Sequence, residues 1–156
     1  MTDLRHGDPH DFDFLAGRWQ VANRRLTTRL AQADDWAEFA ATSWCEPRLG
    51  GAANVDQLDF PTLGFSGLTL RLFDHAARRW SIYWINGRDG VLTPPVQGGF
   101  DGDRGEFLGR DRHAGRDVDV RFLWTRRGAD SARWEQSFSL DGRTWEINWT
   151  MDFTRA

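Results

Sequence analysis

The sequence predicts an all-β protein, an up-and-down antiparallel β-barrel of about ten strands. Polar and apolar residues alternate with a period of two along most of the chain, and almost no segment has the period of a helix. Glycine, proline and Asp-Gly pairs separate these runs at short intervals. About ten strands are too many for the curvature of an open sheet. Closure into a barrel removes the exposed edges.

The segment that opens the first strand organises the predicted barrel. Residues 1–10 are polar, and we expect a flexible N-terminal tail ahead of one barrel domain at 11–156. Asp11–Leu15 predicts a short turn or 3₁₀ segment whose apolar side chains cap one barrel end. Gly17 then lets the chain turn sharply, and Trp19 closes that end of the barrel.

The first four strands are predicted at Trp19–Arg29, Trp36–Glu46, Asn54–Phe60 and Phe65–Phe73. In the first of them, Asn23 and Arg25 share a face with Trp19, so they point inward if Trp19 does. In the fourth, three leucines alternate with Thr69 and Arg71, and we expect Arg71 to point outward toward an acidic partner.

The fifth strand, Arg79–Asn86, is apolar on both faces. Such a strand is either covered outside or packed at an interface, which predicts a possible homodimer through Arg79–Asn86. The longest irregular stretch follows at Gly87–Pro95, where we expect the lid or mouth of the barrel. One of Tyr83 and Trp84 should line that mouth while the other packs outside.

The last five strands are predicted at Val96–Phe100, Arg104–Arg112, Arg116–Arg126, Ser131–Leu140 and Arg143–Arg155. Asp101-Gly102-Asp103 and Asp141-Gly142 lie between alternating runs, which is a strong hairpin signal. In the final hairpin, carboxylates and amides alternate with tryptophans. Plain alternation places Glu135, Glu146 and Asn148 on the outside.

The composition is rich in large aromatic residues. The chain has nine Trp and eleven Phe but one Tyr. So many large rings suggest a wide interior that must be lined or a stacking surface, and the alternative is a barrel filled by its own side chains.

The net charge of −3 and the pI near 5.8 argue against nucleic acid as a partner. No apolar stretch suits a signal peptide or a membrane span, and the single cysteine, Cys45, excludes an intrachain disulfide. We therefore expect a cytoplasmic protein without a membrane partner. Its basic residues are arginines, which fits a high-GC bacterial genome.

Gly17-x-Trp19 at the head of the first strand, with Arg155 at the end of the last, resembles the calycin pattern of lipocalins, fatty-acid-binding proteins and nitrobindins. The opening Asp-Phe-x-Phe-Leu-x-Gly-x-Trp also resembles an uncharacterised family of bacterial nitrobindin-like or lipocalin-like domains. The resemblance implies a barrel with an internal site, closed where the C-terminal arginine packs across the tryptophan through a cation–π contact and hydrogen bonds to carbonyls.

Two departures limit what the resemblance implies. Thr27–Trp36 is too short for the helical lid of fatty-acid-binding proteins. Nitrobindins hold haem through a histidine near the C-terminus, and the last strand here has none. The four histidines lie in the predicted tail or in turns, at His6, His10, His75 and His113. We therefore expect no haem, no other cofactor and no metal site.

The leading functional hypothesis is binding of a small hydrophobic or aromatic molecule inside the barrel. The candidate ligand-binding residues are Asn23, Arg25, Trp44, Tyr83, Trp84, Trp124, Trp134, Gln136 and Trp149. The alternative is a cofactor-free enzyme, an isomerase, cyclase or hydrolase of a hydrophobic metabolite, with a buried carboxylate as acid or base. Candidates for that carboxylate are Glu46, Glu135 and Glu146. Cys45 has no activating histidine and is expected to be a small buried residue.

Overall fold

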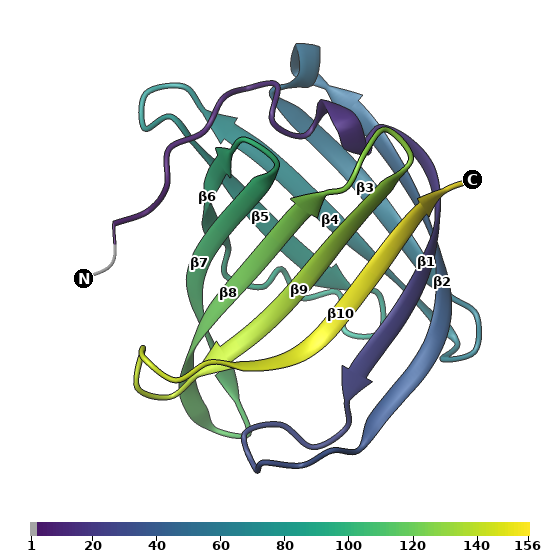
Figure 1. Cartoon of the computed structure of the whole chain (residues 1–156), viewed down its shortest axis with the longest axis vertical. Helices are drawn as coiled ribbons and strands as arrows, with labels where there is room; N and C mark the ends of the chain where they lie inside the picture. The colour runs from purple at the N-terminus through teal and green to yellow at the C-terminus, as the bar shows by residue number, and fades with distance from the viewer. Residues whose placement is uncertain (1–2) are drawn as a thin grey trace.

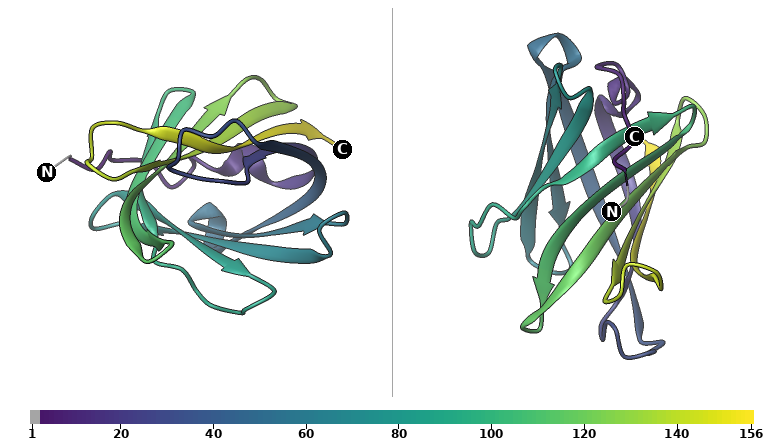
Figure 2. Two further views of the ribbon diagram at one scale, coloured as in Figure 1. Left: turned by 90° about the horizontal axis from the view of Figure 1, so that it is seen from below. Right: turned by 90° about the vertical axis from the view of Figure 1, so that its left-hand side faces the viewer.

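In the computed structural model, which describes residues 3–156, ten antiparallel strands form a closed barrel (Figure 1). The strands are β1 (Gly17–Leu26), β2 (Trp36–Arg48), β3 (Ala53–Phe60), β4 (Phe65–Asp74), β5 (Arg79–Asn86), β6 (Val96–Asp101), β7 (Arg104–His113), β8 (Arg116–Arg126), β9 (Ser131–Ser139) and β10 (Glu146–Arg155). Each strand pairs with the next along the chain, and β10 pairs with β1 to close the ring. Seen from below, the strands surround the interior (Figure 2). The predicted fold class is confirmed.

Two strand boundaries differ from the prediction by three residues, both at the same end of the barrel. β1 ends at Leu26 instead of Arg29, and β10 begins at Glu146 instead of Arg143. The second difference has a local cause, because the Asp141 carboxylate accepts the backbone N–H of Arg143 at 2.8 Å and holds a wider turn. Such hydrogen bonds to backbone N–H groups lower the pKa of Asp141 to about 2.

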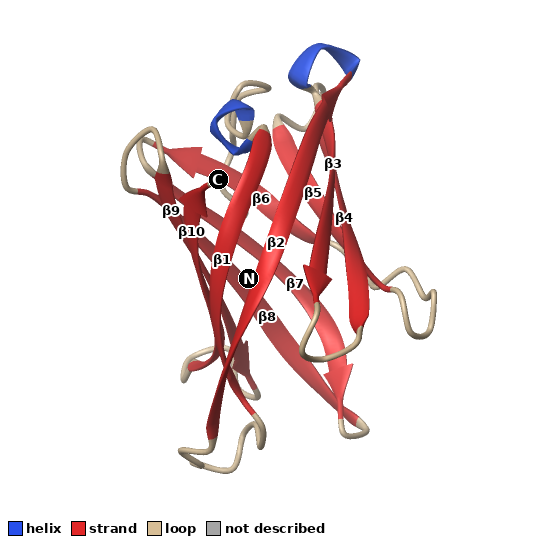
Figure 3. Cartoon of the chain, turned by 90° about the vertical axis from the view of Figure 1, so that its right-hand side faces the viewer, coloured by secondary structure: helices blue, strands red, loops and turns tan. Residues whose placement is uncertain are grey.

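One end of the barrel is closed by the segment that the sequence singles out. The 3₁₀ helices η1 (Asp13–Leu15) and η2 (Leu49–Gly51) both lie at this end (Figure 3). Trp19 is fully buried, and its Nε1 donates to the carbonyl of Leu15 at 2.9 Å. The Arg155 guanidinium lies 4.1 Å from the Trp19 ring centroid and donates to the carbonyls of Ala16 and Phe14 at 2.9 Å. The predicted contact between Trp19 and Arg155 is therefore present.

The segment before η1 also lies against the barrel. The Gly7 N–H donates to the carbonyl of Arg78 at 2.8 Å, and Trp80 Nε1 donates to the carbonyl of Asp8 at 3.0 Å. The Phe12 ring then packs edge-to-face on Trp80, 5.0 Å between centroids. Part of the predicted tail is thus hydrogen-bonded to β5, while residues 1 and 2 lie outside the described residues.

A β-bulge in β10 changes which side chains of that strand face inward. The register with β9 shifts between Ile147 and Trp149. Asn148 is fully buried, and its Oδ1 accepts a hydrogen bond from Gln136 Nε2 at 2.8 Å, while Ile147 remains exposed. The expectation that Asn148 faces outward is therefore wrong, because the extra residue of the bulge breaks the alternation.

The seam between β5 and β6 is the shortest in the barrel. β6 pairs with β5 only through Val96, Gln97 and Gly98, so the end of β5 at 83–86 has no β6 partner. The following loop covers part of this edge, because the N–H and Oγ1 of Thr93 both donate to the carbonyl of Trp84. This seam is the part of the barrel wall with the fewest paired residues. No helix within residues 3–156 is long and apolar enough to cross a membrane.

Candidate functional site

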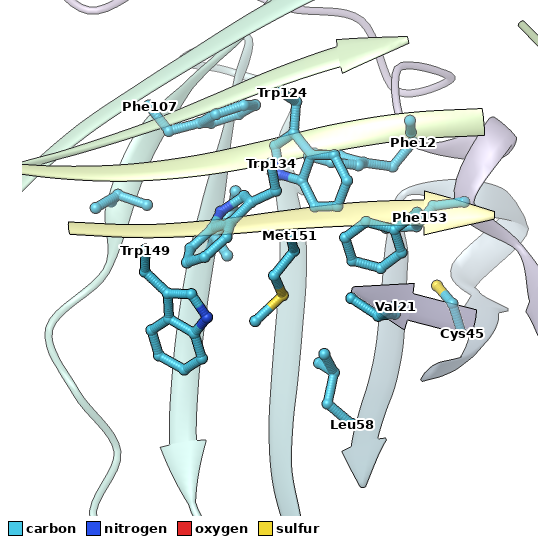
Figure 4. Close-up of a cluster of buried hydrophobic side chains, with 14 of the residues drawn as sticks. Phe12, Val21, Cys45, Leu58, Phe107, Trp124, Trp134, Trp149, Met151 and Phe153 are labelled. Atoms are coloured by element: carbon cyan, nitrogen blue, oxygen red, sulfur yellow. The ribbon is translucent and has the colours of Figure 1, made fainter. Parts of the chain in front are cut away.

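The barrel contains a cavity of about 100 Å³, which we call the barrel cavity. Its walls are mainly aromatic and aliphatic side chains, several of which Figure 4 shows gathered inside the barrel. The lining residues are Asp56, Leu58, Thr69, Arg71, Ile82, Trp84, Thr93, Pro94, Val96, Arg110, Asp111, Val120, Phe122, Trp124, Trp134, Gln136, Phe138, Trp149, Met151 and Phe153.

The aromatic walls hold one another in position. Trp134 meets Trp149 edge-to-face at 5.6 Å between centroids, and it meets Phe122 in the same manner at 5.0 Å. The Trp84 ring packs against Gly67 of β4. A Cβ at position 67 would overlap this ring, so the packing requires glycine. The cavity wall is therefore a packed surface with little freedom to collapse.

A buried ion pair lies in this wall. The side chains of Arg71 and Asp56 are 4% and 1% exposed, and Arg71 Nη2 lies 3.3 Å from Asp56 Oδ2. Arg71 Nη1 donates to Asn54 Oδ1 at 2.9 Å, and the Ser43 hydroxyl donates to Asp56 Oδ1 at 2.6 Å. The expectation that Arg71 points outward is wrong. The leucines of β4 occupy its outer face instead, where Leu72 is 37% exposed.

Two buried N–H groups have no acceptor in the described part of the chain, one in Arg71 of this pair and one in the neighbouring Trp124. Among residues 3–156, no hydrogen-bond partner lies within reach of Arg71 Nε or Trp124 Nε1. Both residues line the barrel cavity. The Arg71 guanidinium lies 5.1 Å from the Phe12 ring centroid and 5.6 Å from that of Trp124, so rings cover it on two sides. Phe12 comes just before η1, so these donors lie toward the closed end of the barrel.

The opposite end is filled by aromatic rings and an arginine. Phe60 stacks on Phe65 at 4.8 Å between centroids. The Arg25 guanidinium lies over both Phe39 and Trp149, 5.1 and 5.0 Å from their centroids. Burial lowers the pKa of Arg25, and the nearby Arg88 lowers it further. These side chains pack together at this end of the barrel, beside Trp149 of the cavity lining.

The cavity reaches the surface at the side of the barrel. Thr93 and Pro94 of the loop after β5 line it there, together with Arg110 and Asp111 of β7. The Arg110 side chain is 74% exposed, so this part of the lining lies at the surface. Its Nε lies 3.5 Å from Asp119 Oδ1. The Gly87–Pro95 loop, predicted as a lid or mouth, thus contributes residues to this opening.

A search against protein-family models found no match for the chain, and neither did a search of curated proteins. The side chains of the site are therefore the basis for assigning a function. Five of the predicted ligand-binding residues line the barrel cavity, namely Trp84, Trp124, Trp134, Gln136 and Trp149.

The other four predicted ligand-binding residues lie elsewhere. Asn23 is buried behind the wall, where its Oδ1 accepts a hydrogen bond from Trp149 Nε1 at 2.9 Å. Arg25 covers the same tryptophan from the filled end. Trp44 is half exposed on the outer face of β2, and Tyr83 pairs with Leu70 between β5 and β4, on the side of β5 away from Ile82 and Trp84. Sequence reasoning placed Arg71 on the outside and did not include Asp56 among the ligand-binding residues, since no motif gives a signal for either side chain in the cavity.

None of the glutamates proposed as acid or base lines the cavity. Glu46 pairs with Arg48, Glu135 pairs with Arg133 at 2.9 Å, and Glu146 accepts the backbone N–H of Leu30 at 2.7 Å. The carboxylates that do line it are those of Asp56 and Asp111.

Cys45 is buried, as predicted, and burial raises the pKa of its thiol to about 12. Since the thiolate is the nucleophilic form, Cys45 is unsuited to nucleophilic catalysis.

The histidines lie outside the lining of the cavity. His10 Nδ1 is 2.9 Å from Asp13 Oδ2 in the segment around η1, and His75 packs on Phe73. His113 packs on Phe138 near the filled end, where burial lowers its pKa and the nearby Arg29 lowers it further. Within residues 3–156, no three His, Cys, Asp or Glu side chains form a group that would hold a metal ion.

Proposed function

We propose that the protein binds a small hydrophobic or aromatic molecule in the barrel cavity. The observation that carries this proposal is the cavity itself, with a wall built mainly from tryptophan, phenylalanine and aliphatic side chains and a small number of polar groups. Ligand sites in proteins have this composition. A cavity of about 100 Å³ suits a ligand with about one aromatic ring, because cavities of similar size in other proteins bind benzene.

The architecture supports the same proposal. A closed ten-stranded antiparallel barrel with Arg155 packed over Trp19 is compatible with a calycin-like fold. Barrels of this kind are wide enough to enclose a small ligand. The proposal includes no cofactor, and no histidine within residues 3–156 lines the cavity where it would hold haem.

The alternative, a cofactor-free enzyme that uses Glu46, Glu135 or Glu146, gains no support from the geometry. A general acid or base must lie within hydrogen-bond reach of its substrate, and these glutamates lie outside the cavity lining. Asp56 does line the cavity, but its carboxylate is engaged by Arg71 and Ser43. Binding is therefore the better-supported function.

Native mass spectrometry of the protein purified from its own host tests the proposal. We expect a bound small molecule whose mass identifies its chemical class. Titration of the purified protein with a panel of single-ring aromatic compounds should then change its tryptophan fluorescence, because Trp124, Trp134 and Trp149 line the cavity and pack on one another or on phenylalanine rings.

Two matched variants locate the binding site. Leu58→Phe adds a ring inside the cavity and should abolish binding, whereas Leu68→Phe makes the same change at a position of β4 that does not line the cavity and should leave binding intact. An empty protein in the mass spectrum, together with no fluorescence change across the panel, would contradict the proposed function.

A further inference from the structure

We propose that the ligand is uncharged and carries a carbonyl oxygen, which accepts hydrogen bonds from Arg71 Nε and Trp124 Nε1 toward the closed end of the barrel. This inference rests on the proposed function, because it names the chemical class that the barrel cavity selects. It goes beyond a generic apolar site, since it assigns a polar partner to two particular side chains.

Among the described residues, Arg71 Nε and Trp124 Nε1 are unpaired, although buried N–H groups are normally paired. Buried N–H groups in folded proteins almost always have an acceptor, because an unpaired one loses its hydrogen bonds to water. The other nitrogens of the Arg71 guanidinium are engaged by Asn54 and Asp56, which fixes the plane of the group and hence the direction of Nε–H. Both unpaired donors belong to residues of the cavity wall, so an acceptor on the ligand would satisfy them.

Within residues 3–156, the lining offers no unpaired positive charge to a ligand. Arg71 is paired with Asp56, and Arg110 is 74% exposed and paired with Asp119. A carboxylate on the ligand would add a charge that no lining residue balances, and a buried unbalanced charge is strongly unfavourable. A neutral carbonyl oxygen accepts the same hydrogen bonds without that penalty.

Apolar side chains surround the two donors. Trp124 packs on Phe153 at 5.2 Å between centroids, and Phe153 also lines the cavity, so apolar surface adjoins the polar contact. The tryptophans at 134 and 149 continue this apolar wall. A ligand with its oxygen at Arg71 and an aromatic ring along this wall matches both features. Small aryl ketones, aldehydes and amides have this form.

The test compares two probes of nearly equal shape. Acetophenone has a carbonyl where α-methylstyrene has a C=CH₂ group, so their affinities differ mainly through the hydrogen bond. We expect acetophenone to bind the wild-type protein roughly fivefold to tenfold more tightly than α-methylstyrene, as measured by calorimetry. Benzoate, the anionic probe, should bind at least about tenfold more weakly than acetophenone.

Two Trp→Phe variants assign the contact. Trp124→Phe keeps a ring but removes Nε1–H, and it should reduce the preference for acetophenone to about twofold to threefold, because Arg71 Nε remains. Trp80→Phe is the matched control, since Trp80 is equally buried but lies outside the cavity lining and donates to Asp8 instead. It should retain the full preference.

A measurement on the wild-type protein does not depend on the variants folding. In ¹H–¹⁵N spectra, acetophenone should shift the Trp124 indole N–H proton downfield, and α-methylstyrene should not. Equal affinities for the two probes, with no selective shift, would overturn this inference and leave the proposed function standing. If benzoate bound most tightly, the assignment of an uncharged ligand would be wrong. If none of the three probes bound, the proposed function would fail with it.

Discussion

Replacing Asp56 with asparagine tests the buried ion pair at the centre of the candidate site. The change keeps the size of the side chain but removes the charge that balances Arg71, whose side chain is 4% exposed. Leaving one member of such a pair uncompensated lowers the free energy of unfolding by about 3–5 kcal/mol. For a chain of 156 residues, this corresponds to a melting temperature lower by roughly 6–20 °C.

The double variant Asp56→Leu/Arg71→Met separates the charge from the packing. Both positions are buried, so apolar residues of similar volume fit the site, and the double variant should unfold within about 1 kcal/mol of the wild type. Urea unfolding followed by far-ultraviolet circular dichroism measures all three free energies. A loss of less than about 1 kcal/mol for Asp56→Asn, or a double variant less stable than the single one, would contradict this role of the ion pair.

Three further predictions concern packing, titration and assembly. Gly67→Ala should lower the free energy of unfolding by about 1–3 kcal/mol and alter the near-ultraviolet circular dichroism, because a methyl group would displace Trp84; unchanged values would contradict this role for Gly67. Burial raises the pKa of Cys45 from 9.0 to about 12, so the unfolded chain ionises first. The free energy of unfolding should therefore fall by about 1.4 kcal/mol per pH unit above pH ~9 and up to pH ~12. The chain has no lysine to mask this slope, and Cys45→Ala should flatten it. The apolar residues along β5 predict a homodimer through Arg79–Asn86, which Tyr83→Glu should dissociate; a monomer at high concentration in sedimentation velocity would exclude it.

The strands and the closed end could be predicted because their signals are local. Alternation with a period of two and Asp-Gly turns specify hairpins from neighbouring residues alone. The contact between Trp19 and Arg155 joins the two ends of the chain, yet it followed from the Gly17-x-Trp19 pattern and its resemblance to calycins.

The polar part of the site was not predictable because alternation does not say which face of a strand is inside. In β4 the leucines favour an inward face, but the side chains of Thr69 and Arg71 line the cavity instead. Ion pairing with Asp56 makes this arrangement stable, and Asp56 belongs to a different strand. The β10 bulge at Asn148 was missed for a similar reason, since no glycine marks it.

The short seam between β5 and β6 also has a consequence for kinetics. Segments held by few backbone hydrogen bonds open at a lower free energy than the whole domain unfolds. The seam lies beside Thr93 and Pro94, where the cavity reaches the surface, so separation of these two strands widens the opening without disturbing the rest of the ring. The residence time of a ligand would then be set by this local fluctuation, and the stability of the barrel as a whole can remain high while its contents exchange quickly.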